Sequence, residues 1–345
     1  MTGSRDLEPS QVPFFPNVFV NNQFRAKPQW PGKDKNLTGQ TAIVTGSNVG
    51  LGYEAALQLL GLKLSHLIVA VRSLEKGQRA ALQMQAKYPN AKIDVWALDL
   101  CSYDSVQAFA KKADAELSRI DIVILNAGLG RFEYHKVDNT GHEESFQVNY
   151  LSTIFLLVLL LPLLKAKRTA GHPAHVTITG AALTLDVKFN HRDKIPLFPA
   201  LDVPENFDRG DSYRVTKVLV QMFLWKLVDY VSADDVVVNI ADPAFVRGTD
   251  FARDLNSSVV AKTLFSLFGY IAGRTPKVGA SCLVDAVVNK GKESHGCFLM
   301  SWKAHPFPPL LYTAEGKNVT QRVWEETLAE FEFAGAREKI ESMKT

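Results

Sequence analysis

Short apolar runs alternate with amphipathic segments along most of the chain. The apolar runs predict strands at residues 41–45, 66–71, 92–98, 121–126, 175–179, 236–240 and 296–300. They lack strict apolar–polar alternation, which is typical of strands buried on both faces. Between them, apolar residues recur at three- and four-residue steps, as in residues 105–117, for which Asp104 is the expected N-cap. The pattern predicts an α/β protein with a Rossmann-type, doubly wound parallel sheet.

Three segments break this alternation. Residues 1–36 are rich in Pro, Asn, Gln and Phe, and we expect them to form an N-terminal arm on a single domain spanning residues 37–345. Residues 183–210 and 244–275 follow the fifth and sixth predicted strands, and we expect them to form the substrate pocket. Their aromatic residues favour a hydrophobic small-molecule substrate; they are Phe189, Phe198, Phe207, Phe245 and Phe251.

Composition and charge exclude several classes of protein. The 345 residues are 46% hydrophobic and carry a net charge of +3, too mild to predict a nucleic-acid or anionic-membrane partner. Three widely spaced cysteines favour a reducing compartment and no metal site. The polar first ten residues do not resemble a signal peptide. The longest apolar run, residues 154–164, contains Pro162 and is too short for an integral membrane segment. Together these features favour a cytoplasmic protein.

A glycine-rich turn follows the first predicted strand. Residues 45–52 read TGSNVGLG and precede a helical segment. Such a turn lets backbone N–H groups approach a pyrophosphate at the start of a helix, so it predicts a dinucleotide site. A tight turn without a ligand is the alternative. The predicted cofactor-binding residues of this turn are Gly46, Ser47, Asn48, Gly50, Leu51 and Gly52.

The end of the second strand bears on which nicotinamide cofactor is bound. Residues 68–73 read IVAVRS and carry no carboxylate that would bond the ribose hydroxyls. Arg72 and Ser73, with Asn48 in the glycine turn, suit a 2′-phosphate, because arginine can form two charge-assisted hydrogen bonds to it. The sequence therefore predicts NADP(H); a solvent-exposed arginine at a helix start is the alternative.

A phenol and an ammonium group lie one helical turn apart further along the chain. Residues 213–217 read YRVTK, which puts Tyr213 and Lys217 on the same helical face. The strand that precedes them ends in Thr179 and Gly180. Taken alone, this helix pair is compatible with an ordinary amphipathic face.

Together and in this order, the motifs resemble those of short-chain dehydrogenases/reductases. The likeness is greatest to the retinol-dehydrogenase-like branch and to its fungal members associated with secondary metabolite biosynthesis. Further matching segments are residues 71–77, 99–100, 125–128, 148–149 and 274–276, so the resemblance covers roughly residues 37–300.

The resemblance implies roles for particular residues. Tyr213 would be the general acid or base, and Asn149 would support a water that carries the proton onward. Lys217 would hold the nicotinamide ribose and lower the pKa of Tyr213. Residues 151–164 match the helix that builds a dimer or tetramer in relatives, so the resemblance allows a homodimer; packing on the sheet is the alternative. The further cofactor-binding residues implied are Asp99, Leu100, Asn126, Ala127, Gly128, Pro243, Phe245, Val246 and Thr249.

Two positions depart from the family pattern. Gly180 stands where the family has its catalytic serine, and losing such a donor costs about 10²–10³ in rate. Thr179 or Thr184 would then supply the missing hydroxyl, or the substrate would. Alternatively, the protein is a redox-silent isomerase, lyase or cyclase, or it binds cofactor without turnover. In the second departure, Ala244 replaces the expected glycine and Thr249 stands one position late.

Overall fold

The chain folds around one eight-stranded sheet with the strand order β3-β2-β1-β4-β5-β6-β7-β8. The structure is a computed structural model that describes residues 3–32, 34–248, 269–270 and 272–344. All residues of β1 and of β6 are buried, which explains why the apolar runs do not alternate. The strands are β1 Thr41–Thr45, β2 His66–Val71, β3 Lys92–Ala97, β4 Ile122–Leu125, β5 Ala174–Thr179, β6 Val236–Ala241, β7 Phe298–Met300 and β8 Lys303–His305.

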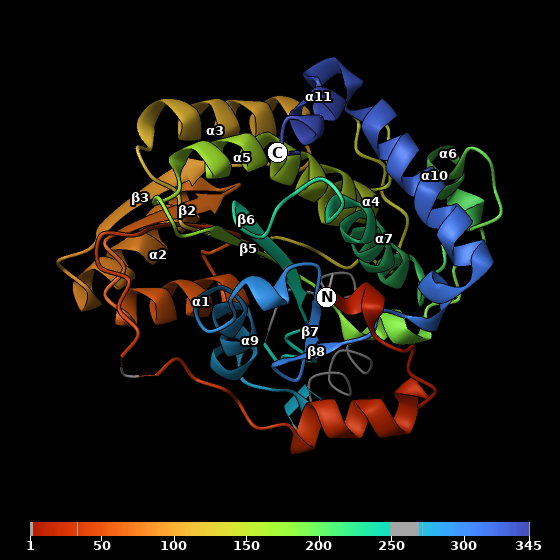
Figure 1. Cartoon of the computed structure of the whole chain (residues 1–345), viewed down its shortest axis with the longest axis horizontal. Coiled ribbons are helices and arrows are strands. Elements are labelled where there is room, and N and C mark those ends of the chain that lie inside the picture. Colours follow the sequence, from red (N-terminus) through yellow and green to blue (C-terminus); the bar gives the residue numbers. More distant parts are fainter. Residues whose placement is uncertain (1–2, 33, 249–268, 271, 345) are drawn as a thin grey trace.

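Helices cover both faces of the sheet, as Figure 1 shows. Helices α1 and α9 pack on one face, and α3, α5 and α7 pack on the other, so that each face has its own apolar cluster. This confirms the predicted doubly wound fold. The helices are α1 Gly50–Gly61, α2 Leu74–Lys87, α3 Tyr103–Glu116, α4 Glu144–Phe146, α5 Thr153–Lys167, α6 Leu197–Leu201, α7 Ser212–Leu227, α9 Pro276–Val288, α10 Ala314–Glu330 and α11 Ala336–Glu341.

The strand order creates a crevice at the carboxyl ends of the strands. The chain builds β1, β2 and β3 outward in one direction and then crosses to place β4 on the other side of β1. In open α/β sheets, ligands bind where the order reverses in this way. The glycine turn after β1 and residues 126–128 after β4 therefore meet at the expected cofactor site.

Two sequence predictions of local structure are wrong. The sheet has an eighth strand, β8, which pairs antiparallel with β7 through Ser301 and Trp302, both with positive φ. Nothing in these two residue types marks a hairpin turn. The cap of α3 is Ser102, whose hydroxyl accepts the Ser105 N–H at 3.2 Å, so Asp104 is not the N-cap but lies in the first turn.

Within the N-terminal arm, residues 3–25 lie on the side of the sheet that carries β7 and β8 (Figure 1). Its helical turns are Gly3–Asp6, Phe14–Val18 and Asn21–Arg25. Ser4 is fixed to the last two strands, because its Oγ donates to the His305 carbonyl at 2.6 Å and accepts the Phe298 N–H at 2.7 Å. The arm thus runs from the sheet edge back toward the ends of β6 and β7.

One helical run, Glu144–Lys167, is long and apolar enough to cross a membrane by length and composition. Within the fold, 89% of its most apolar window is buried. Core helices of globular domains share this composition, and α5 packs against α3 and α11. The run is therefore accounted for as a core helix.

Candidate active site

The glycine turn after β1 forms a cradle for a pyrophosphate. Gly46 and Gly50 have φ of +65° and +59°, a conformation that favours glycine. A Cβ at Gly52 would lie 2.5 Å from the Gly46 carbonyl oxygen and 2.6 Å from Asn126 Nδ2. Helix α1 starts at this turn without a side-chain cap. Its first N–H groups are thus open to an anion, and the residues fit a dinucleotide phosphate.

The chain after β4 braces this cradle. Thr45 Oγ1 accepts the N–H groups of Asn126 and Ala127, both at 2.9 Å. The Asn126 side chain donates to the Thr45 carbonyl at 3.0 Å, and Ser47 Oγ donates to the Val44 carbonyl at 2.8 Å. The predicted contacts at residues 46–52 and 126–128 therefore lie side by side across the β1–β4 pair.

The residues predicted to meet a 2′-phosphate lie at the end of β2. The Arg72 side chain is exposed and forms no hydrogen bond or ion pair within the described part of the chain, so it is free to meet a phosphate. Ser73 Oγ accepts the Lys76 N–H at 3.4 Å and so caps α2. Asp99, after β3, is half-buried and accepts the Cys101 N–H at 3.0 Å.

Helix α7 carries the predicted catalytic pair. Lys217 Nζ lies 5.9 Å from the centre of the Tyr213 ring and donates to the Thr179 carbonyl at 2.8 Å. The ammonium group is buried among neutral groups, which lowers the pKa of Lys217 to about 8. Lys217 therefore ties α7 to the end of β5, and its charge is poorly solvated.

Asn149 joins this pair from the neighbouring helix. It lies in a π-helical turn, Gln147–Ser152, a distortion that is frequent at functional sites. Its side chain bonds both backbone groups of Leu129, at 2.8 and 2.7 Å, and donates to Thr216 Oγ1 at 3.2 Å. A Cβ at Gly128 would lie 3.0 Å from Asn149 Oδ1 and 3.6 Å from Lys217 Nζ. The structure thus brings these predicted residues together beside the cradle.

The pKa of Tyr213 depends on groups besides Lys217, and a lowering by Lys217 stays a prediction. The resemblance implies that Lys217 lowers the pKa of Tyr213. In the structure, burial of the phenol raises the pKa of Tyr213 well above its usual value, and the negative charge of Asp242 raises it further. The phenol of Tyr213 is therefore protonated at neutral pH.

Gly180 occupies a space that has no room for a side chain. A Cβ at this position would lie 2.5 Å from Ile240 Cγ2 and 3.5 Å from Phe298 Cε2. The backbone φ of Gly180 is not positive, so conformation does not demand a glycine here. Packing does, because Ile240 on β6 fills the space that the serine of the family would enter.

The two hydroxyls predicted to replace the serine, those of Thr179 and Thr184, do not lie free beside Gly180. Side chains alternate along β5, and Ile178 lies in the cluster under α5 and α7. Thr179 therefore points to the other face, where its register partner Ala241 lies in the cluster under α1 and α9. Thr184 Oγ1 already donates to the Ala181 carbonyl at 2.9 Å and accepts from Gln221. A catalytic role for Thr179 stays a prediction, and neither placement favours one.

The loop after β6 has Ala244 where the family pattern has a glycine. Ala244 has a φ of +62°, the left-handed conformation that glycine adopts at no cost. Pro243 is buried, and Phe245 and Val246 follow beside Arg274, whose N–H donates to the Phe245 carbonyl at 2.8 Å. Thr249 and Phe251 lie outside the described residues.

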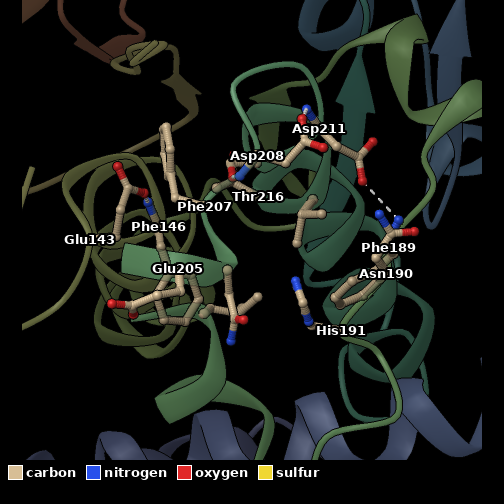
Figure 2. A pocket seen from close by; sticks show the side chains of 14 residues that line it. Glu143, Phe146, Phe189, Asn190, His191, Glu205, Phe207, Asp208, Asp211 and Thr216 are labelled. Atoms are coloured by element: carbon tan, nitrogen blue, oxygen red, sulfur yellow. Dashed lines mark hydrogen bonds between the residues drawn. The ribbon is translucent and has the colours of Figure 1, made fainter. Parts of the chain in front are cut away.

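A cavity of about 210 Å³ opens between α7, the start of α4 and the segment 189–208 (Figure 2). Phe189 and Phe207 line it, but Tyr213 does not, so the assignment of residues 183–210 to the substrate pocket stays a prediction. Phe198 instead packs in the core, 5.1 Å from the Phe146 ring centre. The lining is not apolar alone, because carboxylates also contribute to it; they are Glu143, Glu205, Asp208 and Asp211.

Comparisons with known proteins identify the family. A family model described as short chain dehydrogenase matches residues 40–181. A short chain dehydrogenase/reductase of Annulohypoxylon moriforme, mfmJ, is 56% identical over 344 residues, which cover 100% of this chain and 99% of the relative. A short chain dehydrogenase of Hypocrea virens, virL, is 42% identical, with 94% of each chain covered. The chain belongs to the short-chain dehydrogenases/reductases, a family of oxidoreductases that use nicotinamide cofactors.

Solved structures share the fold at lower identity. The L-sorbose reductase of Gluconobacter frateurii, complexed with NADPH and L-sorbose, is 17% identical with a TM-score of 0.59, over 78% of this chain and 97% of that one. An NADPH-bound short chain oxidoreductase of Pseudomonas aeruginosa, described as containing an atypical catalytic center, is 17% identical with a TM-score of 0.58, over 76% and 95%.

Sequence reasoning missed three residues near the site. Ile240 fills the space beside Gly180, but a branched apolar residue in a buried strand carries no functional signal. Asn22 and Gln23 are buried at the ends of β6 and β7, although they belong to the arm. Their only signal is the high amide content of the arm, which does not say where it docks.

Proposed function

We propose that the protein is an NADP(H)-dependent oxidoreductase that interconverts a carbonyl and an alcohol on a small molecule with apolar parts, in secondary metabolite biosynthesis. The observation that carries this proposal is the meeting of Tyr213, Lys217 and Asn149 beside the glycine cradle. These residues come from two helices and meet at the carboxyl ends of the strands. A buried ammonium, a buried amide and a phenol at this place indicate a functional site, because apolar side chains would pack there at lower cost.

The residues suit proton transfer to a carbonyl oxygen. When bound, the nicotinamide supplies a hydride to the carbonyl carbon, and NADP⁺ and an alcohol result. Tyr213 gives its proton to the carbonyl oxygen, and its raised pKa favours this direction at neutral pH. The Lys217 ammonium stabilises the phenolate that is left, and Asn149 lies beside Lys217 on the path for reprotonation.

The preference for NADP(H) rests on Arg72. Its guanidinium is exposed at the end of β2 and lacks a protein partner among the described residues. A carboxylate that would repel a phosphate is absent from residues 68–73. Two charge-assisted hydrogen bonds to a 2′-phosphate would favour NADPH over NADH by about 10- to 100-fold.

Arg72→Ala tests this preference. We expect NADPH binding, measured by fluorescence titration, to weaken about 10- to 100-fold while NADH binding changes little. Arg79→Ala is the matched control, because Arg79 is exposed on the adjacent helix α2 and pairs with Glu75 at 3.0 Å. Equal loss for both cofactors, or no loss, would contradict the proposal.

A redox-silent isomerase, lyase or cyclase is the second candidate, and the closed space at Gly180 favours it. Without the serine, Tyr213 still transfers protons, which is all that such a reaction requires. Product formation without a change in NADPH absorbance would establish this candidate. Binding of cofactor with no product from a broad panel of ketones, alcohols and enones would indicate a protein that binds cofactor without turnover.

A further inference from the structure

The N-terminal arm places a buried polar side chain, that of Asn22, at the end of β6. Asn22 is buried, and its Nδ2 donates to Asp242 Oδ2 at 2.7 Å. Its Oδ1 accepts from Ser301 Oγ at 2.7 Å, and its carbonyl accepts from the Arg274 guanidinium. The segment before α9 and the turn between β7 and β8 therefore fix Asn22 on Asp242 at the end of β6.

Asp242 is a buried carboxylate held by neutral donors. Its side chain is buried, and Oδ1 accepts the Ala182 N–H at 2.9 Å. Within the described residues, no lysine or arginine forms an ion pair with it. A buried carboxylate needs hydrogen-bond donors, and Asn22 and the Ala182 N–H supply them, while the Arg274 guanidinium bonds the carbonyls of Asn22 and Pro243 beside it. Because Ala182 follows Gly180 by two residues, Asp242 also fixes the chain as it leaves β5.

The charge of Asp242 acts on titratable groups of three other elements. On α7, burial raises the pKa of Tyr213, and Asp242 raises it further. On α9, burial raises the pKa of Cys282; Arg274 opposes this and Asp242 adds to it. On β8, burial lowers the pKa of His305 and Asp242 opposes that change. Since Lys217 faces the Tyr213 ring from its own helix, the phenol lies within the fields of one cation and one anion.

The next residue of the arm holds the neighbouring loop. Gln23 Oε1 accepts the Phe245 N–H at 3.0 Å, and its Nε2 donates to the carbonyls of Phe245 and Ala272 at 3.0 and 2.6 Å. The Gln23 amide thus forms the hydrogen bonds that these backbone N–H and C=O groups need. The arm therefore supports two successive parts of the site, the carboxylate at residue 242 and the loop after it.

We propose that Asn22 and Asp242 are positioning residues of the reaction: Asn22 orients the buried Asp242 carboxylate, which holds the chain at the exit of β5 through the Ala182 N–H and places a negative charge in the surroundings of Tyr213. The inference rests on the proposed function in one respect, that Tyr213 is the proton donor. It assigns the arm a part in the chemistry beyond covering the sheet edge.

A charge swap separates a positioning role from a structural one. In Asp242→Asn, one of the two donors loses its acceptor and the charge is removed. In Asn22→Asp/Asp242→Asn, the hydrogen bond between the two side chains is restored in reverse, but the charge moves to the arm beside Arg274. Asp285→Asn is the control, because Asp285 is an equally buried carboxylate on α9, bonded to Asn289 and Lys290.

Three measurements are made on the full chain: thermal unfolding, the NMR titration of His305, and the pH dependence of kcat/KM for NADPH-dependent ketone reduction. Removing the charge lowers the pKa of Tyr213, so we expect the fall of kcat/KM at high pH to begin about one pH unit lower in Asp242→Asn. The pKa of His305 falls too. We expect Asp242→Asn to lower Tm and the swap to restore it, while the titration of His305 and the pH profile of kcat/KM stay shifted in the swap. Asp285→Asn should leave both the His305 titration and the pH profile unchanged.

The outcomes distinguish the inference from the proposed function. Unshifted titrations in Asp242→Asn, or a swap that returns the pH profile to that of the wild type, would overturn the inference and leave the reductase intact. If the wild type reduces no ketone, the proposed reductase activity is wrong, and so is a role of Asp242 in that reaction. If the His305 titration and Tm still respond as expected, the conclusion that the arm positions the Asp242 charge holds.

Discussion

Restoring the family's serine at Gly180 should destabilise the protein rather than repair it. A Cβ at this position lies 2.5 Å from Ile240 Cγ2, whereas carbon atoms pack at about 3.5–4.0 Å. Ile240 is fully buried, and its Cγ2 branches directly from Cβ, so rotation cannot clear the space cheaply. Overpacking of this kind costs about 1–3 kcal/mol. We therefore expect Gly180→Ser to lower the free energy of unfolding by that amount.

A double-mutant cycle measures whether Ile240 is the cause. Ile240→Ala alone should cost about 2–5 kcal/mol through the cavity it leaves. In Gly180→Ser/Ile240→Ala the serine enters that cavity, so the combined loss should fall short of the sum by about 1–3 kcal/mol. Val238→Ala is the control, because Val238 is buried on the same strand in the same apolar cluster. Urea denaturation gives the values; strict additivity with Ile240→Ala would refute the packing explanation.

Two further predictions concern stability. Ala244→Gly should raise the free energy of unfolding by about 1 kcal/mol, because Ala244 has a φ of +62°; a loss in urea denaturation would show that the methyl group packs usefully. Burial lowers the pKa of His142, but its hydrogen bonds to Asp202 and Glu330 raise it to about 9. The stabilisation by His142, up to about 3 kcal/mol, is thus full below about pH 6.5 and lost as pH rises through 9. The difference in stability between wild type and His142→Gln should shrink over that range, and a difference that stays constant with pH would argue against a charged His142.

The sequence predicts the sheet well because buried strands carry a strong signal. Seven of the eight strands lie within two residues of their predicted bounds. β8 escapes because its turn uses Ser301 and Trp302 at positive φ, where a hairpin usually has Gly, Asn or Asp. Burial of Trp302, its hydrogen bond to Ser281 at 3.2 Å and the Arg274 guanidinium 4.6 Å from its ring stabilise this turn. Those contacts are tertiary, so no local pattern reveals them.

The candidate site, too, is only partly predictable from the sequence. The helical spacing puts Tyr213 and Lys217 on one face, but only the resemblance assigns them a role. Asn149 is found only through the resemblance, because its π-helical turn has no sequence signature. The surroundings of the site come from distant parts of the chain. Asn22 reaches Asp242 across 220 residues, and Ile240 closes the space at Gly180 from a neighbouring strand. Pairings of this range depend on how the arm and the strands dock, which one sequence does not encode locally.

The central claim is that this site transfers a hydride although the serine is missing. The most direct test incubates the wild type with NADPH that carries deuterium at both C4 positions of the nicotinamide and a panel of ketones, and analyses the products by mass spectrometry. The account predicts an alcohol that carries one deuterium at the former carbonyl carbon, with equivalent loss of NADPH and no product from Tyr213→Phe. A product that forms through Tyr213 without deuterium, with NADPH unchanged, would contradict hydride transfer.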